Sequence, residues 1–158
     1  MFLGACGFQP LYSNRPTGGG AREFSKIRIE PIKDRVGQIL HNHLLTALNP
    51  NGPPQNPLFS MTVTVSESSS SLGVRKSAFA TRANLNVSAA FKLSDFETRK
   101  GVFSQTSRIT VSYNILDSDF ATLSAKKDAR ARALREISED IRVRLGVYFT
   151  QAQSFPKK

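Results

Sequence analysis

The 158-residue chain has one cysteine, two histidines and no tryptophan. A single cysteine cannot form an internal disulfide, and two histidines without further cysteines do not supply a zinc site. Acidic residues are also scarce, because 12 Asp and Glu stand against 22 Lys and Arg, for a formal charge of +10. Such a surface attracts anions, among them nucleic acid, anionic lipid and phosphorylated glycolipid. Charge alone does not choose among these partners.

Long apolar runs are missing as well. No stretch approaches the 18 or more apolar residues that a membrane-spanning helix needs. Hydrophobic residues make up 39% of the chain, close to the globular norm, and the length fits one ordinary domain. We therefore expect a single domain with a real core that does not cross a bilayer as a helix.

The one cysteine, Cys6, follows Leu3, Gly4 and Ala5 and precedes Gly7. An apolar residue three positions upstream and two small residues before the cysteine form the pattern that a lipoprotein signal peptidase cleaves. Acyl chains on Cys6 would then tether the protein, since two or more chains bind a membrane stably. Residues 1–5 lack the basic and apolar regions of a full signal peptide, so we expect a start further upstream or an earlier removal of the leader. The alternative is a small apolar residue near a frayed terminus.

Hydrophobic periodicity predicts an α+β fold. Apolar residues alternate with polar ones in the predicted strands and recur every three or four positions in the predicted helices. Pro31 argues for an edge strand, Asp34 is expected to cap the first helix, and the serine-rich run 67–73 is expected to be a loop. The predicted strands are 27–32, 59–66, 79–93 and 103–113, and the predicted helices are 36–48 and from about 118 onward.

This order, β-α-β-β-β-α, fits a four-stranded, largely antiparallel sheet with two helices packed on one face and a polar face opposite. Between Ser68 and Asn114 seven basic residues stand against two acidic ones. Any one of them could be an ordinary solvated charge, so only the cluster is a hypothesis. The candidate anion-binding residues after the serine-rich run or on the polar face are Arg75, Lys76, Arg82, Lys92 and Arg108.

The string Cys6-Gly7-Phe8-Gln9-Pro10-Leu11-Tyr12 resembles the opening of mature members of the LptE family, lipopolysaccharide-assembly lipoproteins of Gram-negative outer membranes. The likeness continues in Ala80-Thr81-Arg82 before the longest predicted strand, and from Asp128-Ala129 to Tyr148-Phe149 in the last predicted helix. The resemblance divides the chain into a signal-peptide remnant (1–5), a lipid anchor and tether (6–24), one LptE-like domain (25–150) and a tail (151–158).

The resemblance implies a non-enzymatic subunit anchored to the periplasmic leaflet of the outer membrane. It would plug and help assemble the large β-barrel LptD and bind lipopolysaccharide, with the five candidate basic residues meeting lipid A phosphates. No cofactor is implied beyond the covalent lipid on Cys6, and no nucleic-acid partner. Gly7 permits outer-membrane sorting, because lipoproteins kept in the inner membrane typically carry an acidic residue at this position.

Three other functions compete with this interpretation. A double-stranded RNA-binding domain has the order α-β-β-β-α and basic residues at its second helix, as Lys126 and Lys127 are here. Another periplasmic lipoprotein would keep the anchor but not the Phe8–Tyr12 string. An enzyme is the weakest alternative, because His41 and His43 are two positions apart on a predicted helix and face different directions.

Overall fold

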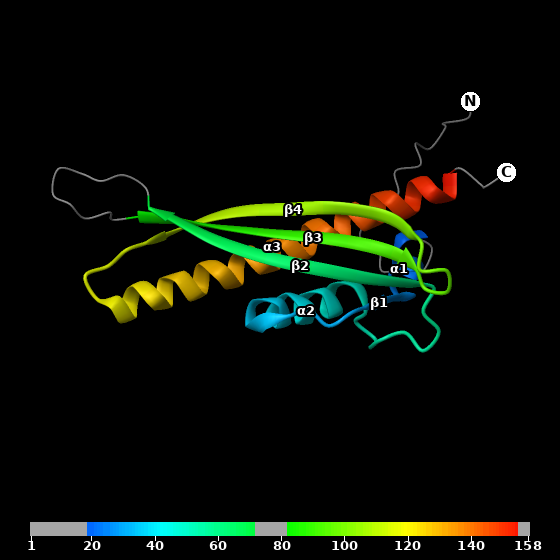
Figure 1. Ribbon diagram of the computed structural model, residues 1–158, viewed down its shortest axis with the longest axis horizontal. Coiled ribbons are helices and arrows are strands. Elements are labelled where there is room, and N and C mark those ends of the chain that lie inside the picture. The colour runs from blue at the N-terminus through cyan, green and yellow to red at the C-terminus, as the bar shows by residue number, and fades with distance from the viewer. Residues whose placement is uncertain (1–18, 72–81, 155–158) are drawn as a thin grey trace, which may run out of the picture.

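The computed structural model describes residues 19–71 and 82–154 (Figure 1). The elements follow one another as α1 (Gly19–Phe24), β1 (Ile27–Ile29), α2 (Asp34–Leu48), β2 (Phe59–Ser71), β3 (Arg82–Asp95), β4 (Gly101–Asn114) and α3 (Asp119–Ser154). Apart from the short α1, this is the predicted order, and the α+β class is confirmed. The last residues of the expected tether (6–24) form the helix α1. The first residues of the expected tail (151–158) are helical as well, because α3 continues to Ser154.

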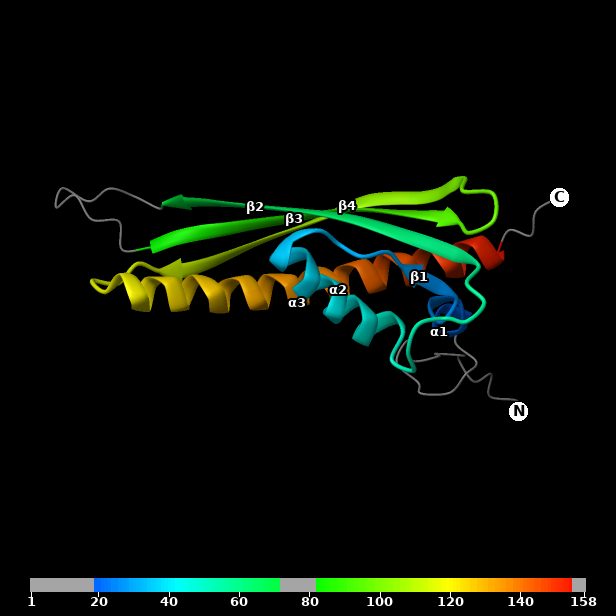
Figure 2. The ribbon, with the colours of Figure 1, turned by 60° about the horizontal axis from the view of Figure 1, so that its bottom comes forward.

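The four strands form one sheet in the order β1-β2-β3-β4. β1 pairs with β2 in parallel, whereas β2, β3 and β4 form an antiparallel meander. β1 stops at Ile29, before Pro31, and lies at a sheet edge as predicted, because proline cannot donate to a ladder. Both long helices lie on one face of the sheet and leave the other face bare (Figure 2).

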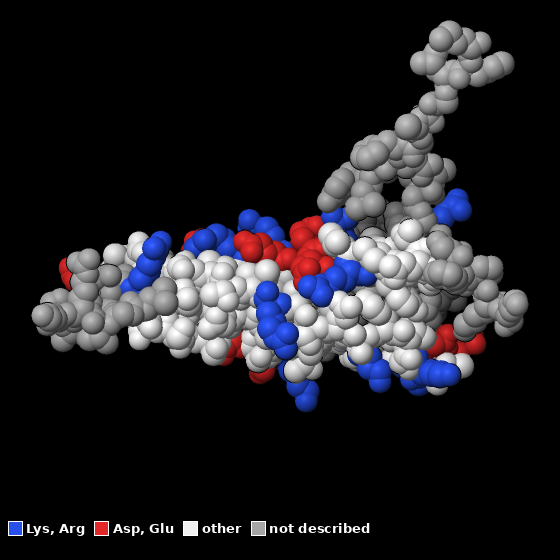
Figure 3. Space-filling view, turned by 90° about the horizontal axis from the view of Figure 1, so that it is seen from above, with Lys and Arg blue, Asp and Glu red and all other residues white. Residues whose placement is uncertain are grey.

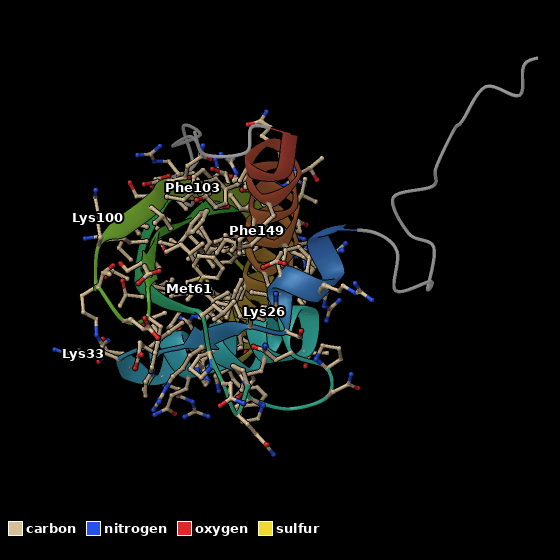
Figure 4. All side chains as sticks on the ribbon, turned by 90° about the vertical axis from the view of Figure 1, so that its right-hand side faces the viewer. Lys26, Lys33, Met61, Lys100, Phe103 and Phe149 are labelled. Carbon is tan, nitrogen blue, oxygen red and sulfur yellow. The ribbon has the colours of Figure 1, made fainter. Side chains whose placement is uncertain are left out.

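The core lies between the sheet and the helices. β3 alternates strictly, so that residues such as Leu85, Phe91 and Leu93 are buried while their neighbours point outward. α2 and α3 each contribute one apolar stripe, which includes Leu44 and Ile141. Full burial of each such side chain contributes about 1.5–3 kcal/mol. Figure 4, viewed along the molecule, shows Met61, Phe103 and Phe149 in the interior between sheet and helix.

Aromatic rings join the C-terminal part of α3 to its surroundings. Tyr148 stacks on Phe103 of β4 with 4.7 Å between ring centroids. Phe149 contacts Phe24 of α1 and Phe59 of β2 at 6.2 and 5.3 Å. Because Tyr148 and Phe149 lie in one turn of α3 and contact β4, β2 and α1, these contacts fix where α3 lies against the sheet.

The molecule is elongated. With 36 residues, α3 is about 54 Å long and spans most of the long axis. α1, the β3–β4 turn and the end of α3 lie together at one end, which we call the α1 end (Figures 1 and 2). The start of α3 and the paired residues Ser71 and Ala83 lie toward the opposite end, the hairpin end.

Two local predictions are wrong. The run 67–73 is not a loop over its first five residues, because β2 continues to Ser71 and pairs with β3 up to Ala83. Serine has low strand propensity, but backbone pairing with a well-formed neighbour decides the conformation. Asp34 does not cap α2, since the N-cap is Lys33 and no side-chain cap bond forms. Asp34 is instead in the first turn, where a carboxylate still interacts favourably with the helix dipole.

Candidate functional site

The bare side of the sheet is the candidate site. We call it the outer face and define it by the outward positions of β2, β3 and β4, which the register and the alternation of buried residues identify. Outside the irregular pair Gly101 and Val102, these positions hold three cations, one alanine and otherwise only Ser, Thr and Asn. None of them is a carboxylate, but Glu30 reaches the edge of the face and accepts a hydrogen bond from the Ser60 hydroxyl at 2.8 Å. The members are Ser60, Thr62, Thr64, Ser66, Ser68, Ser70, Arg82, Asn84, Asn86, Ser88, Ala90, Lys92, Ser94, Ser104, Thr106, Arg108, Thr110, Ser112 and Asn114.

Cross-strand hydrogen bonds order part of the outer face. The Thr110 hydroxyl donates to Asn86 Oδ1 at 2.8 Å, and the Ser112 hydroxyl donates to Asn84 Oδ1 at 2.7 Å. Each asparagine thus accepts through its oxygen and keeps its NH₂ group for other partners. Fixed amide donors beside cations suit a polar or anionic surface.

The structure places Arg82, Lys92 and Arg108 on the outer face, but it does not bring them together. Arg108 pairs with Ser88, which is six residues from Arg82 and four from Lys92 along β3. At about 3.3 Å per residue, these separations are about 20 and 13 Å. The three cations therefore form a line along the sheet and cannot share one phosphate group. Arg75 and Lys76 lie outside the described residues, as do Leu3, Gly4, Ala5, Cys6 and Gly7.

A shallow hollow lies on the outer face around Ala90. The register puts Thr64 of β2 and Thr106 of β4 on either side of this small side chain. Lys92 contributes to the rim and extends over Gly101, whose added Cβ would lie 2.6 Å from Lys92 Cε. The hollow is lined by Thr62, Thr64, Ala90, Phe91, Lys92, Ser104, Gln105 and Thr106. Hydroxyls with one ammonium group can bind a polar or anionic group.

A second basic feature, at the α1 end, was not predicted. The guanidinium carbons of Arg99 and Arg28 lie 5.2 and 6.0 Å from the centroid of the Phe96 ring. Arg99 has a φ of 58°, which the tight β3–β4 turn imposes. Arg28 lies on β1, so a linear count of charges could not pair it with Arg99. Oε1 of Glu30 lies 3.9 Å from Nε of Arg28, so this carboxylate offsets part of the positive charge of the two arginines.

One ion pair ties β2 to α3. Arg130 donates from Nε and Nη2 to the two carboxylate oxygens of Glu67, at 2.7 and 2.6 Å. These bonds lower the pKa of Glu67 below its usual 4.5, although partial burial opposes the shift. Glu67 lies on the helix side of β2, opposite the outer face, so the role of the pair is to hold the hairpin end of β2 against the helix.

The described residues do not form a metal site. His41 and His43 are both half-buried on α2, two positions apart. Across residues 19–71 and 82–154, no group of three or more His, Cys, Asp or Glu is placed to hold a metal ion. In the same ranges, every helix is too short or too polar to traverse a bilayer.

Solved structures share this fold. The chain is similar to a protein from Caulobacter crescentus CB15 described as a lipoprotein, with 21% identity and a TM-score of 0.72 over 84% of this chain and 96% of that one. A minor lipoprotein from Acinetobacter baumannii and lipoprotein B from Nitrosomonas europaea each show 13% identity and a TM-score of 0.61 over 79% of this chain. They are covered over 94% and 84% of their own lengths. No curated protein has a significant sequence match to the chain.

The sequence pattern of one family, LptE, lipopolysaccharide-assembly, matches residues 24–145. The matched span begins at the end of α1, includes all four strands and α2, and ends within α3. It favours the first function that the sequence suggested over the RNA-binding alternative. The 14-residue strands and the strand before the first long helix agree with this choice. The chain belongs to the LptE lipopolysaccharide-assembly family.

Proposed function

We propose that this protein is a non-enzymatic subunit of a lipopolysaccharide translocon. Acyl chains on Cys6 would hold it on the periplasmic leaflet of the outer membrane. The domain would plug and help assemble an LptD-like β-barrel and would bind lipopolysaccharide during delivery. Membership of the LptE family supports the general role. The observation that carries the finer proposal is the outer face, a bare sheet face whose own outward positions hold cations, hydroxyls and amides and no carboxylate.

The outer face suits the interior of a barrel. The lumen of an outer-membrane barrel is polar and holds water, whereas its lipid-facing side is apolar. Hydroxyl and amide groups of the outer face can exchange hydrogen bonds with water and with polar lumen side chains. The apolar side of the sheet is covered by α2 and α3, so the face that remains open to a partner is the polar one. An elongated plug about 54 Å long could extend through such a lumen.

The line of cations suits a ligand with several separated anionic groups. Arg82 and Arg108 can each bind a phosphate bidentately, and Lys92 can act as a point charge beside the hollow. Because the backbone positions of Arg82 and Lys92 are ten residues, or about 33 Å, apart along β3, one phosphate cannot engage all three cations. Lipopolysaccharide carries phosphates and sugar hydroxyls, and both kinds of group have partners on this face.

The test is purification from outer membranes. The chain would be expressed behind a native leader with a C-terminal tag, and mild detergent extracts would be analysed by mass spectrometry. We expect a stoichiometric large barrel, bound lipopolysaccharide and acyl chains on Cys6. A Cys6→Ser variant is the control, because it should leave the membrane fraction while folding normally. Recovery of the unmodified protein with bound RNA would overturn the proposal.

A further inference from the structure

β4 is the outermost strand of the sheet, and one of its edges is open. It pairs with β3 along its length, and within residues 19–71 and 82–154 no strand pairs with its other edge. No backbone hydrogen bond from another described segment reaches Ser104–Asn114 either. A long strand edge of this kind can receive a further strand.

Two hydrogen bonds at the α1 end reveal which way the backbone of β3 points. The Asp95 N–H donates to the Lys100 carbonyl on the β4 side, and the Phe96 N–H donates to the Leu58 carbonyl on the β2 side. Because N–H and C=O groups alternate in direction along a strand, odd-numbered residues of β3 bond to β4 and even-numbered residues bond to β2.

The register extends this alternation to β4. Odd residues of β3 lie opposite odd residues of β4, as in the pairs Phe91–Gln105 and Val87–Ile109. The even residues Thr106, Arg108 and Thr110 therefore direct their N–H and C=O groups to the open edge. Their side chains belong to the outer face, so a strand added here would enlarge that face.

The open edge carries few of the features that usually block pairing. β4 contains no proline and one charged residue, Arg108. Its register irregularity, opposite Leu93 and Ser94, is confined to the α1 end. Figure 3 shows the molecule from above, the side where β4 lies in Figure 1. Charged side chains gather along one long side of this view, and broad uncharged areas lie beside them. Natural edges are normally protected by charges, prolines or bulges along their length.

Exposed apolar side chains lie on α3, next in the chain to residues that contact β4. α3 follows β4, since Tyr148 stacks on Phe103 and Arg144 donates to Gln105 at 2.7 Å. One residue after Tyr148, Phe149 turns toward α1 and β2. With 100° per residue, Val147 points away from Phe149, on the solvent side of α3 and next to Tyr148. Val147 is 52% exposed, and Val143, one turn earlier, is 42% exposed.

We propose that the open edge of β4 binds an extended segment of the barrel partner as a fifth strand, with apolar side chains of that segment covering Val143 and Val147. This inference rests on the proposed function. Arg108 favours a different chain over a second copy, because antiparallel self-pairing centred on the strand would set two Arg108 side chains beside each other. The expected segment carries a neutral or acidic residue opposite Arg108.

Amide hydrogen exchange on the purified complex tests the proposal, with the protein alone as reference. In the protein alone, the N–H groups of Thr106, Arg108 and Thr110 should exchange fast, and those of Gln105 and Ile109 slowly. In the complex, the three even residues should slow by about tenfold or more, because they now donate to the added strand.

The open edge of β2 provides an internal control for general shielding inside the lumen. The Phe59 N–H donates to Lys26, on the β1 side, so odd residues of β2 face that edge. Past Met61, where pairing with β1 ends, Val65 and Glu67 should exchange similarly with and without the barrel. Equal slowing at both edges would overturn the strand addition, and so would fast exchange of Thr106 and Thr110 in the complex.

A variant pair gives a second measurement. Val147→Glu should lower the recovery of the barrel by about tenfold, whereas Leu58→Glu should not, since Leu58 is similarly exposed at 50% but precedes β2, which β3 separates from β4. Equal recovery of the barrel with both variants would overturn the strand addition while leaving the proposed function intact.

Two further outcomes bear on the partner. If no barrel is recovered with the wild-type chain, the proposed function is overturned together with the proposed partner. If the protein alone formed a dimer at high concentration, and Thr106, Arg108 and Thr110 exchanged slowly in that dimer, the partner at the open edge would be a second copy and the choice of the barrel would be overturned.

Discussion

Gly37 shows how one missing side chain positions α2. A Cβ added there would lie 2.5 Å from Ile32 Cγ2 and 3.1 Å from the Ile32 backbone carbon. Ile32 is itself buried and follows β1, so it cannot move away freely. We predict that Gly37→Ala lowers the free energy of unfolding by about 1–3 kcal/mol, the usual cost of overpacking. Urea unfolding followed by circular dichroism measures this difference.

The same substitution in α3 is the matched control. A Cβ at Gly146 would lie 3.6 Å from Phe24 Cζ, an ordinary contact. Gly146→Ala should therefore raise the free energy of unfolding by about 0.5–1 kcal/mol, because glycine is entropically costly inside a helix. If both variants shifted stability in the same direction, close packing at Gly37 would not be the cause.

At the scale of elements, the Glu67–Arg130 pair joins the hairpin end of β2 to α3. Its side chains are 25% and 23% exposed, so solvent screens them only in part. We predict that Glu67→Gln lowers the free energy of unfolding by about 1 kcal/mol near pH 7. The folded-state pKa of Glu67 lies below 4.5, so this contribution is present above pH 4.5 and is lost as the pH falls through the folded value. Urea unfolding of both proteins across this range measures the effect.

The Asp128–Arg132 pair provides the control for this ion pair. It lies within α3, joins no second element, and its side chains are 72% and 49% exposed. Asp128→Asn should change stability by less than about 0.5 kcal/mol. A double-mutant cycle with Glu67→Gln and Arg130→Gln isolates the pairwise energy. If Glu67→Gln and Asp128→Asn changed the free energy of unfolding equally, an ion pair that joins two elements would contribute no more stability than one within a single helix.

At the scale of the whole molecule, the spacing of charges on the outer face decides how a ligand is bound. Arg82, Lys92 and Arg108 are too far apart to act as one site. We predict that replacing any one with Gln weakens lipopolysaccharide capture only a few-fold, and that the three effects add in free energy, since sites more than about 10 Å apart behave independently. Binding titrations of the single, double and triple variants at physiological salt measure this.

Arg132→Gln is the control for these binding titrations, because it removes an equal charge from α3, on the helix side of the sheet. It should leave capture nearly unchanged. A loss of all binding from one outer-face substitution would indicate a single compact site, which the register does not provide.

The sequence by itself determined the order of the strands and the two long helices, the α+β class and the sidedness of the sheet. Each depends on local periodicity, and β3, where Ala83 to Leu93 alternate with polar residues, shows the clearest pattern. The pattern also identified Arg82, Lys92 and Arg108 as outward residues. Family membership was likewise accessible from the sequence, because it rests on residue identities along most of the chain.

Only the tertiary structure decided what depends on contacts between distant segments. β2 runs on to Ser71 because β3 supplies a pairing partner that composition cannot reveal. Arg28 of β1 contacts Phe96 of the β3–β4 turn, and Arg130 of α3 binds Glu67 of β2, because folding brings these segments together. The separation of the three outer-face cations and the open edge of β4 follow from register and strand order. Local propensity carries no information on either, because both arise when separate elements pair.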